Sequence, residues 1–146
     1  TIDFYGTCED PKILEIITNE EKMNYMGIVS NKNIYDILLK YDALVLPSYY
    51  DGEGYPGSII ESFQCGLPII TTNWRSIPEI VDESCGFLVN VKSANEIRNA
   101  IINLNSDEKL YKKLCLGSQK KSKSFDEEIW IDFYINSIRK LINFDF

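Results

Sequence analysis

The fold of this chain is decided by residues 43–72, which read ALVLPSYYDGEGYPGSIIESFQCGLPIITT. Residues 43–46 are a continuous apolar run, and residues 67–71 form a second run of the same kind. Such runs are typical of strands covered on both faces, and therefore of a parallel sheet. Between them, residues 59–65 have helical character, and Gly66 is placed to end the helix as a C-terminal cap. The stretch therefore predicts a strand, a loop, a helix and a second strand.

The same alternation extends to both sides of this stretch. Further strands are expected at residues 2–5, 24–28 and 87–89. Further helices are expected from residue 11, at 34–41 and 78–81, from 93 to about 104, from 106, and from 124 or 126 to about 143. Alternating strands and helices with short connections indicate an α/β domain with a Rossmann-like, doubly wound parallel sheet. Ligands of such sheets bind at the edge formed by the carboxyl ends of the strands.

Polar residues that can cap helices support these boundaries. Asp10 precedes Pro11, and an aspartate followed by proline is a typical helix start. Ser93 and Glu96 have the spacing of a capping box. Two more caps are expected, one at Ser106 and one at either Ser124 or Asp126.

The composition excludes several classes of function. The net charge is −7, which argues against a nucleic-acid-binding protein because such domains are usually basic. The chain has no histidine, so a Ser-His-Asp triad, a Cys-His pair and a histidine general base are excluded. The four cysteines have no C-x-x-C spacing, and we interpret them as buried, reduced thiols rather than as a zinc site.

The segment 47–61 is expected to lie at the ligand-binding edge, because it leaves a buried strand and enters a helix. Its glycines allow the backbone to approach a ligand closely. The N–H groups of Gly57, Ser58 and Ile59 are expected to be free at the start of the helix. Free N–H groups at a helix N-terminus bind phosphate or diphosphate.

Two alternative interpretations of this segment remain open from the residues alone. Gly52, Gly54 and Gly57 fit the G-x-G-x-x-G pattern of NAD-type oxidoreductases. The strand that follows should then end in an acidic residue, but it ends at Asn73. Separately, the pattern from Ser58 to Glu61 fits a capping box, which would give the Glu61 carboxylate a structural role.

A wider pattern gives this segment a functional interpretation. Glu53 and Glu61 are separated by seven residues. Together with the segments at 47–48, 65–70, 77–81 and 86–89, this pair resembles the nucleotide-sugar-binding, C-terminal domain of GT-B glycosyltransferases, and within them glycosyltransferase family 4. The resemblance runs from about Gly27 to Val89 and continues more weakly through Phe125.

The resemblance implies a role for each matching residue. Glu61 is expected to accept hydrogen bonds from the ribose of the donor nucleotide, and Glu53 to act catalytically beside the donor sugar. Gly54 and Tyr55 would shape the loop around the sugar, Gly57 and Ser58 would bind the diphosphate, and Val29 would pack against the nucleobase. Family members with this pair of glutamates retain the anomeric configuration. No metal or other cofactor is expected, because the departing diphosphate is stabilised by positive charge.

The resemblance also implies an organisation and a set of partners. Residues 1–123 would form the nucleotide-sugar-binding domain without its first strand-helix unit, as the start at Thr1 rather than Met suggests. Residues 124–146 would form a helix packing partly on this domain and partly toward an absent N-terminal domain, leaving some apolar side chains exposed. Expected partners are a UDP-sugar and a glycan or lipid-linked acceptor of bacterial surface polysaccharide or O-antigen synthesis, and not nucleic acid.

The expected location is the cytoplasm, with peripheral contact at the inner face of the membrane as an option. Because the phosphate-gripping Arg and Lys of the family have no counterpart here, we expect the chain alone to be inactive. A sugar-nucleotide-binding module without catalytic activity is a further alternative.

Overall fold

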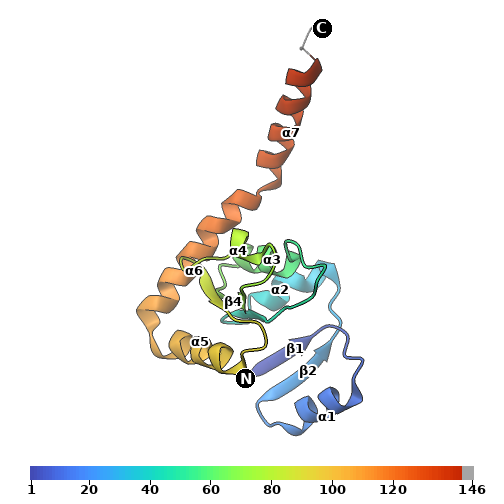
Figure 1. Ribbon diagram of the computed structural model, residues 1–146, viewed down its shortest axis with the longest axis vertical. Helices are drawn as coiled ribbons and strands as arrows, with labels where there is room; N and C mark the ends of the chain where they lie inside the picture. The colour runs from blue at the N-terminus through green and yellow to red at the C-terminus, as the bar shows by residue number, and fades with distance from the viewer. Residues whose placement is uncertain (143–146) are drawn as a thin grey trace. The chain divides into compact units, whose positions relative to one another are not determined.

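A computed structural model describes residues 1–142 of the chain (Figure 1). It contains parallel β-sheets with helices between the strands, which confirms the predicted α/β class. The chain divides into two compact units, the first comprising residues 1–37 and the second beginning at Leu38. The two units are described separately.

The first unit contains a parallel pair of strands joined by a helix. Its elements are β1 (Ile2–Tyr5), α1 (Pro11–Asn19), β2 (Met23–Gly27), the 3₁₀ turn η1 (Asn31–Asn33) and the start of α2 (Ile34–Leu38). Ile2 lies opposite Met23 in the parallel register. The Asp10 side chain accepts a hydrogen bond from the Lys12 N–H at 2.9 Å, so the predicted cap of α1 is confirmed.

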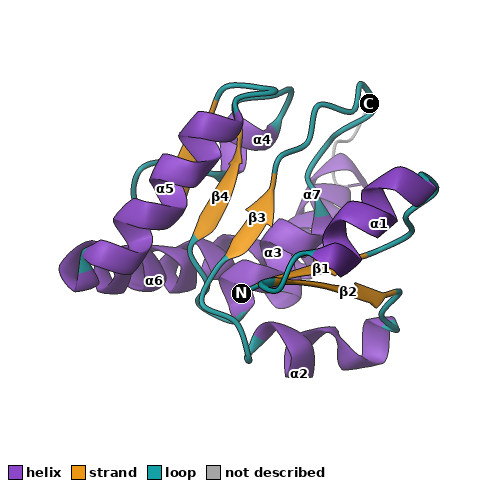
Figure 2. Cartoon of the chain, turned by 90° about the horizontal axis from the view of Figure 1, so that it is seen from below, coloured by secondary structure: helices purple, strands orange, loops and turns teal. Residues whose placement is uncertain are grey.

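The second unit contains a three-stranded parallel sheet with the strand order β3-β4-β5, of which β3 and β4 lie side by side in Figure 2. Its elements are β3 (Leu44–Leu46), α3 (Gly57–Gln64), β4 (Ile69–Thr72), α4 (Ile77–Ile80), β5 (Gly86–Val89), α5 (Ala94–Ser106), α6 (Glu108–Ser122), the 3₁₀ turn η2 (Lys123–Phe125) and α7 (Glu127–Ile142). The order of strands and helices agrees with the alternation expected from residues 43–72.

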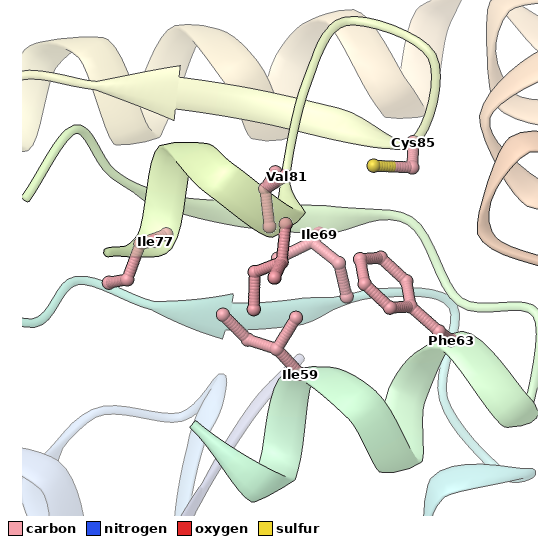
Figure 3. Packing of buried hydrophobic residues seen from close by; sticks show 7 residues of the cluster. Ile59, Phe63, Ile69, Ile77, Val81 and Cys85 are labelled. Carbon is pink, nitrogen blue, oxygen red and sulfur yellow. The ribbon is translucent and has the colours of Figure 1, made fainter. Parts of the chain in front are cut away.

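The core of the second unit lies around the central strand β4. Figure 3 shows Ile69 of β4 next to Ile59 and Phe63 of α3. Ile77 and Val81 belong to the same buried cluster. Ile70 points to the opposite face and is also buried, while α5 packs against β4 and β5 (Figure 2). The apolar run at 67–71 therefore does form a strand covered on both faces.

The apolar run at 43–46 differs from its prediction. β3 is the edge strand of this sheet, and its residues are half-buried rather than buried.

The cysteines also differ from their prediction as buried thiols, because all four are free but only Cys85 is buried. The helix end at Gly66 is as expected, with a φ of +72° that favours glycine.

The predicted cap at Ser106 is wrong, whereas Ser93 is the N-cap residue of α5 as predicted but lacks the predicted hydrogen bonds. Ser106 is the last residue of α5, and the next helix is capped by Asp107, whose carboxylate accepts from the Leu110 N–H at 2.9 Å. Ser93 makes no side-chain cap bond, and the Glu96 carboxylate instead accepts from the backbone N–H of Asn90 at 2.7 Å. The helix after α5 therefore begins one residue later than predicted, and the Glu96 carboxylate bonds to the segment before α5 rather than to Ser93.

The last helix, α7, is capped by Asp126, which is one of the two caps predicted for it. Asp126 accepts from the Glu128 N–H at 3.0 Å, whereas Ser124 belongs to η2. Phe125 of η2 stacks on Phe63, with ring centroids 6.2 Å apart. This side chain, rather than one of α7, covers the core at that point.

The apolar face of α7 is open along Glu127–Ile142, where none of the residues is buried. The packing of part of this helix on the domain stays a prediction, and residues 143–146 lie outside the described part of the chain. The large apolar side chains exposed on α7 are Ile129, Trp130, Ile131, Phe133, Tyr134, Ile135, Ile138, Leu141 and Ile142. Within residues 1–142, the helices are either too short or too polar to span a bilayer.

Candidate functional site

The predicted ligand loop lies at the carboxyl end of β3, as expected for this class of sheet. Residues 47–56 connect β3 to α3 and precede the first turn of that helix. Residues 47–51 line an open hollow of about 540 Å³. The loop and the N-terminus of α3 therefore share one edge of the sheet.

The start of α3 offers two free backbone donors. Pro56 is the N-cap residue and has no N–H of its own. The N–H of Ile59 donates to the Pro56 carbonyl at 3.0 Å, so the prediction of a free N–H at this residue is wrong. Within residues 1–142, the N–H groups of Gly57 and Ser58 have no acceptor. An anion at this helix end would find these two donors and the positive end of the helix dipole.

Glu61 lies in the second turn of α3 and is half-buried. Among the described residues, its carboxylate has no hydrogen-bond or ion-pair partner. Burial, with a smaller contribution from the negative charge of Glu61, raises the pKa of the Cys65 thiol one turn later. Gly57 and Glu61 are four residues apart and therefore lie on one face of the helix. The Glu61 carboxylate thus lies one turn along the helix from the free donors, which point out of its N-terminal end.

The capping-box interpretation of Glu61 is wrong. The helix begins at Gly57 and its N-cap is Pro56, so Ser58 is the second residue of the helix and cannot be its cap. No side-chain hydrogen bond caps α3. Glu61 is therefore left without the structural role that its spacing from Ser58 indicated.

Glu53 lies in the loop, and its carboxylate is held by Ser48. The Ser48 hydroxyl donates to Oε2 of Glu53, and both residues are half-buried. The backbone N–H of Glu53 donates to the Tyr50 carbonyl at 3.1 Å, which closes a turn through Asp51 and Gly52. Glu53 thus has a defined orientation.

A second segment, residues 72–79, binds the loop through four side-chain contacts. Thr72 donates to the Ser48 carbonyl, Trp74 Nε1 donates to the Tyr50 carbonyl at 2.8 Å, Arg75 pairs with Asp51 at 2.9 Å, and the Tyr55 hydroxyl donates to Glu79 at 2.5 Å. In each pair the two residues are 24 positions apart. The loop after β3 and the segment after β4 therefore run alongside each other in a constant register.

Two of these contacts bear on the predicted roles. Tyr55, expected to shape the loop around the sugar, is held at its hydroxyl by Glu79, and this hydrogen bond is the main cause of its raised pKa. Glu79 lies in the first turn of α4, where a negative charge interacts favourably with the helix dipole. Arg75 forms an ion pair with Asp51. It also lies over the Trp74 ring, with 5.2 Å between the guanidinium carbon and the ring centroid.

Gly54 lies exposed in the loop between Glu53 and Tyr55. Val29 belongs to the first unit, where it follows β2 and is half-buried. Its expected contact with a nucleobase stays a prediction, as do the roles of the loop residues. The structure does bring Glu53, Gly57, Ser58 and Glu61 onto one loop-helix segment.

The comparison with protein families decides among the alternatives. Residues 12–121 match the family model described as "Glycosyl transferases group 1". The chain belongs to this family. The assignment favours the glycosyltransferase over the NAD-type interpretation of the three loop glycines.

The chain is also similar to curated glycosyltransferases of bacteria. The chain is 27% identical over 139 residues to N,N'-diacetylbacillosaminyl-diphospho-undecaprenol alpha-1,3-N-acetylgalactosaminyltransferase of Campylobacter jejuni, covering 94% of this chain and 36% of that protein. It is 30% identical over 83 residues to O-antigen chain mannosyltransferase B of Escherichia coli, covering 55% of this chain and 21% of that protein. The chain thus spans well under half the length of these relatives.

Solved structures show the same fold. HepE of Anabaena, in a complex with UDP, superposes with a TM-score of 0.84 at 18% identity, covering 94% of this chain and 40% of HepE. The C-terminal domain of the group 1 glycosyltransferase LpcC from Francisella tularensis superposes with a TM-score of 0.65 at 23% identity, covering 77% of this chain and 58% of that one. These likenesses confirm the predicted GT-B, Rossmann-like fold.

Proposed function

We propose that the chain is the donor-binding domain of a retaining, family 4 glycosyltransferase that uses a UDP-sugar. The observation that carries this proposal is the half-buried carboxylate of Glu61, which is unpaired within residues 1–142 and lies one turn along α3 from the free N–H of Gly57. A ligand with a phosphate at the helix end and hydroxyls one turn along satisfies both groups. A nucleoside diphosphate has this arrangement.

The diphosphate end of the donor is assigned to the start of α3. When the bond between the anomeric carbon and the diphosphate oxygen breaks, negative charge develops on the leaving phosphate. The N–H groups of Gly57 and Ser58 are fixed by the helix before the reaction and need no reorganisation to stabilise that charge. Ionised Glu61 accepts hydrogen bonds from the ribose, because a carboxylate has acceptor sites only.

The sugar end of the donor is assigned to the loop. Positive charge develops at the anomeric carbon as the bond breaks, and the Glu53 carboxylate is the acidic group proposed to face it. Gly54 and Tyr55 then border the sugar. The reaction is proposed to need no metal, with positive charge outside this segment completing the diphosphate site.

The comparisons support the choice of donor and acceptor classes. HepE was solved with UDP, and the name of the Campylobacter relative gives it an undecaprenol-diphosphate-linked substrate. We therefore propose UDP-sugar as donor, a glycan or lipid-linked acceptor, and a role in bacterial surface polysaccharide or O-antigen synthesis. The location proposed is the cytoplasm, with peripheral contact to the membrane, and the 146 residues alone are proposed to be inactive.

Ligand-observed NMR of the chain with UDP, GDP and NAD tests this proposal. UDP is expected to give saturation transfer to its ribose protons, which Glu61→Ala should strongly reduce. Glu83→Ala is the matched control, because Glu83 is an exposed carboxylate just before the amino end of β5, away from the carboxyl edge of the sheet. Preferential binding of NAD, or UDP binding that Glu61→Ala leaves intact, would contradict the proposal.

A further inference from the structure

The Ser48 hydroxyl has partners that fix the direction of its proton. It accepts a hydrogen bond from the Tyr50 N–H at 3.3 Å and lies within hydrogen-bond reach of Glu53 Oε2. A serine hydroxyl has one proton, and an ionised carboxylate has none to give. The proton of Ser48 therefore points to Glu53, and the carboxylate is the acceptor.

Ser48 is itself fixed to the sheet. Its carbonyl accepts a hydrogen bond from the hydroxyl of Thr72, the last residue of β4, which is fully buried. The connection therefore runs from the central strand through Ser48 to the Glu53 carboxylate. The turn closed by the Glu53 N–H and the Tyr50 carbonyl holds the other end of the same segment.

The two carboxylate oxygens of Glu53 are left in different situations. Oε2 is bound by Ser48, whereas within residues 1–142 Oε1 has no hydrogen-bond partner. A glutamate side chain that is free in solution loses rotamer freedom when a ligand orders it, and this lowers affinity. A glutamate ordered beforehand by a serine avoids that loss.

We propose that Ser48 is a positioning residue that orients Glu53 so that Oε1 is presented to the donor sugar. This inference rests on the proposed function, since it takes from it the placement of Glu53 beside the sugar. It adds to that site a residue for which the sequence pattern predicted no individual role. Ser48 acts through Glu53 and has no contact with the reacting atoms.

The test separates the sugar contribution to binding from the nucleotide contribution. Dissociation constants of the chain are measured for UDP, UDP-glucose and UDP-N-acetylglucosamine. The ratio of the constant for UDP to that for each UDP-sugar is the gain in affinity due to the sugar, here called the sugar gain. Ser48→Ala is expected to lower the gain about tenfold, the order of magnitude of one hydrogen bond to a charged group. Affinity for UDP alone should stay within about twofold, and Ser48→Thr should restore the gain because it keeps the hydroxyl.

The structure supplies a matched control for the connection to β4. Thr71 is also fully buried, and its hydroxyl donates to the Leu46 carbonyl at 2.8 Å, one step before the contact of Thr72 with Ser48. Thr72→Val is expected to lower the sugar gain, whereas Thr71→Val should leave it unchanged. Equal effects of the two variants would mean that the loss reflects general loosening, and the inference would be wrong.

A crystal structure of Ser48→Ala gives a readout that needs no ligand. The Glu53 carboxylate is expected to leave the orientation that it has in the parent chain, and an unchanged carboxylate would overturn the inference. Failure of the proposed function looks different: the parent chain would bind no UDP, or Glu53→Ala would leave the sugar gain intact. A sugar gain that Glu53→Ala removes but Ser48→Ala preserves would refute the positioning role alone.

Discussion

Gly117 of α6 gives a prediction in which packing and helix propensity have opposite signs. A Cβ atom at this position would lie 1.8 Å from the Ser84 carbonyl oxygen and 2.6 Å from its carbonyl carbon. Both atoms belong to the backbone and cannot turn away as the end of a side chain could. The contact is also anchored nearby, because the hydroxyl of Ser118 donates to the Leu67 carbonyl at 2.8 Å.

The magnitude follows from the two opposing effects. Alanine is favoured over glycine inside a helix by about 1 kcal/mol. Overpacking a well-packed contact costs about 1–3 kcal/mol, and here α6 must move by more than an ångström, so the upper end applies. Gly117→Ala should therefore lower the free energy of unfolding by about 2 kcal/mol, which lowers the Tm of a chain of this size by roughly 4–8 °C.

Urea and thermal unfolding followed by circular dichroism measure this change. Gly57→Ala is the matched control, because Gly57 is also a helical glycine and a Cβ there meets nothing within 4 Å. It should leave the stability unchanged or raise it by up to about 1 kcal/mol. If Gly117→Ala were as stable as the parent chain, the reasoning on the contact between α6 and Ser84 would be refuted.

Three further predictions concern charge, hydrogen bonding and exposed surface. Hydrogen bonds from Lys121 and Ser84 lower the pKa of Asp82 to about 2, so ionised Asp82 stabilises the fold by about 1 kcal/mol after solvent screening; this contribution is present above pH 4 and is lost as the pH falls toward 2. In urea titrations at decreasing pH, the stability of Asp82→Asn should therefore fall less steeply than that of the parent chain, and parallel curves would contradict this. Glu79→Gln should let Tyr55 ionise at a lower pH in a spectrophotometric titration, because the hydrogen bond and negative charge of Glu79 raise its pKa, and an unchanged curve would argue against the contact. The exposed apolar side chains of α7 should bind the dye ANS, so deleting residues 127–146 should reduce its fluorescence, and a chain silent before deletion would mean that this face is covered.

The backbone plan of this chain could be predicted from local sequence signals. The apolar run at 67–71, the cap at Asp10 and the glycine at position 66 each act within a few residues, and the structure agrees with all three. The errors at Ser106 and Ser93 arose where several polar residues near a helix start can form its hydrogen bonds. There the carboxylates of Asp107 and Glu96, rather than the serine hydroxyls, accept from backbone N–H groups.

The site could be predicted only in part, because its support comes from residues far apart in the sequence. The loop and the start of α3 follow from glycines, proline and the spacing of Glu53 and Glu61. The contacts of Thr72, Trp74 and Glu79 with the loop depend on how β3 and β4 align, and no motif marks them. Likewise, the bond between the Ile59 N–H and the Pro56 carbonyl depends on where the helix begins, which sequence patterns place only to within a few residues.

The central claim is that the start of α3, with Glu61, holds the diphosphate and ribose of a nucleotide donor. A titration of the ¹⁵N-labelled chain with UDP, followed by amide chemical shifts, tests it most directly. The account predicts that the largest shifts fall on the free N–H groups of Gly57 and Ser58, with a smaller shift at the already bonded Ile59. It also predicts that Glu61→Ala weakens UDP binding about tenfold. UDP binding whose largest shifts fall away from α3 and its preceding loop would contradict the account.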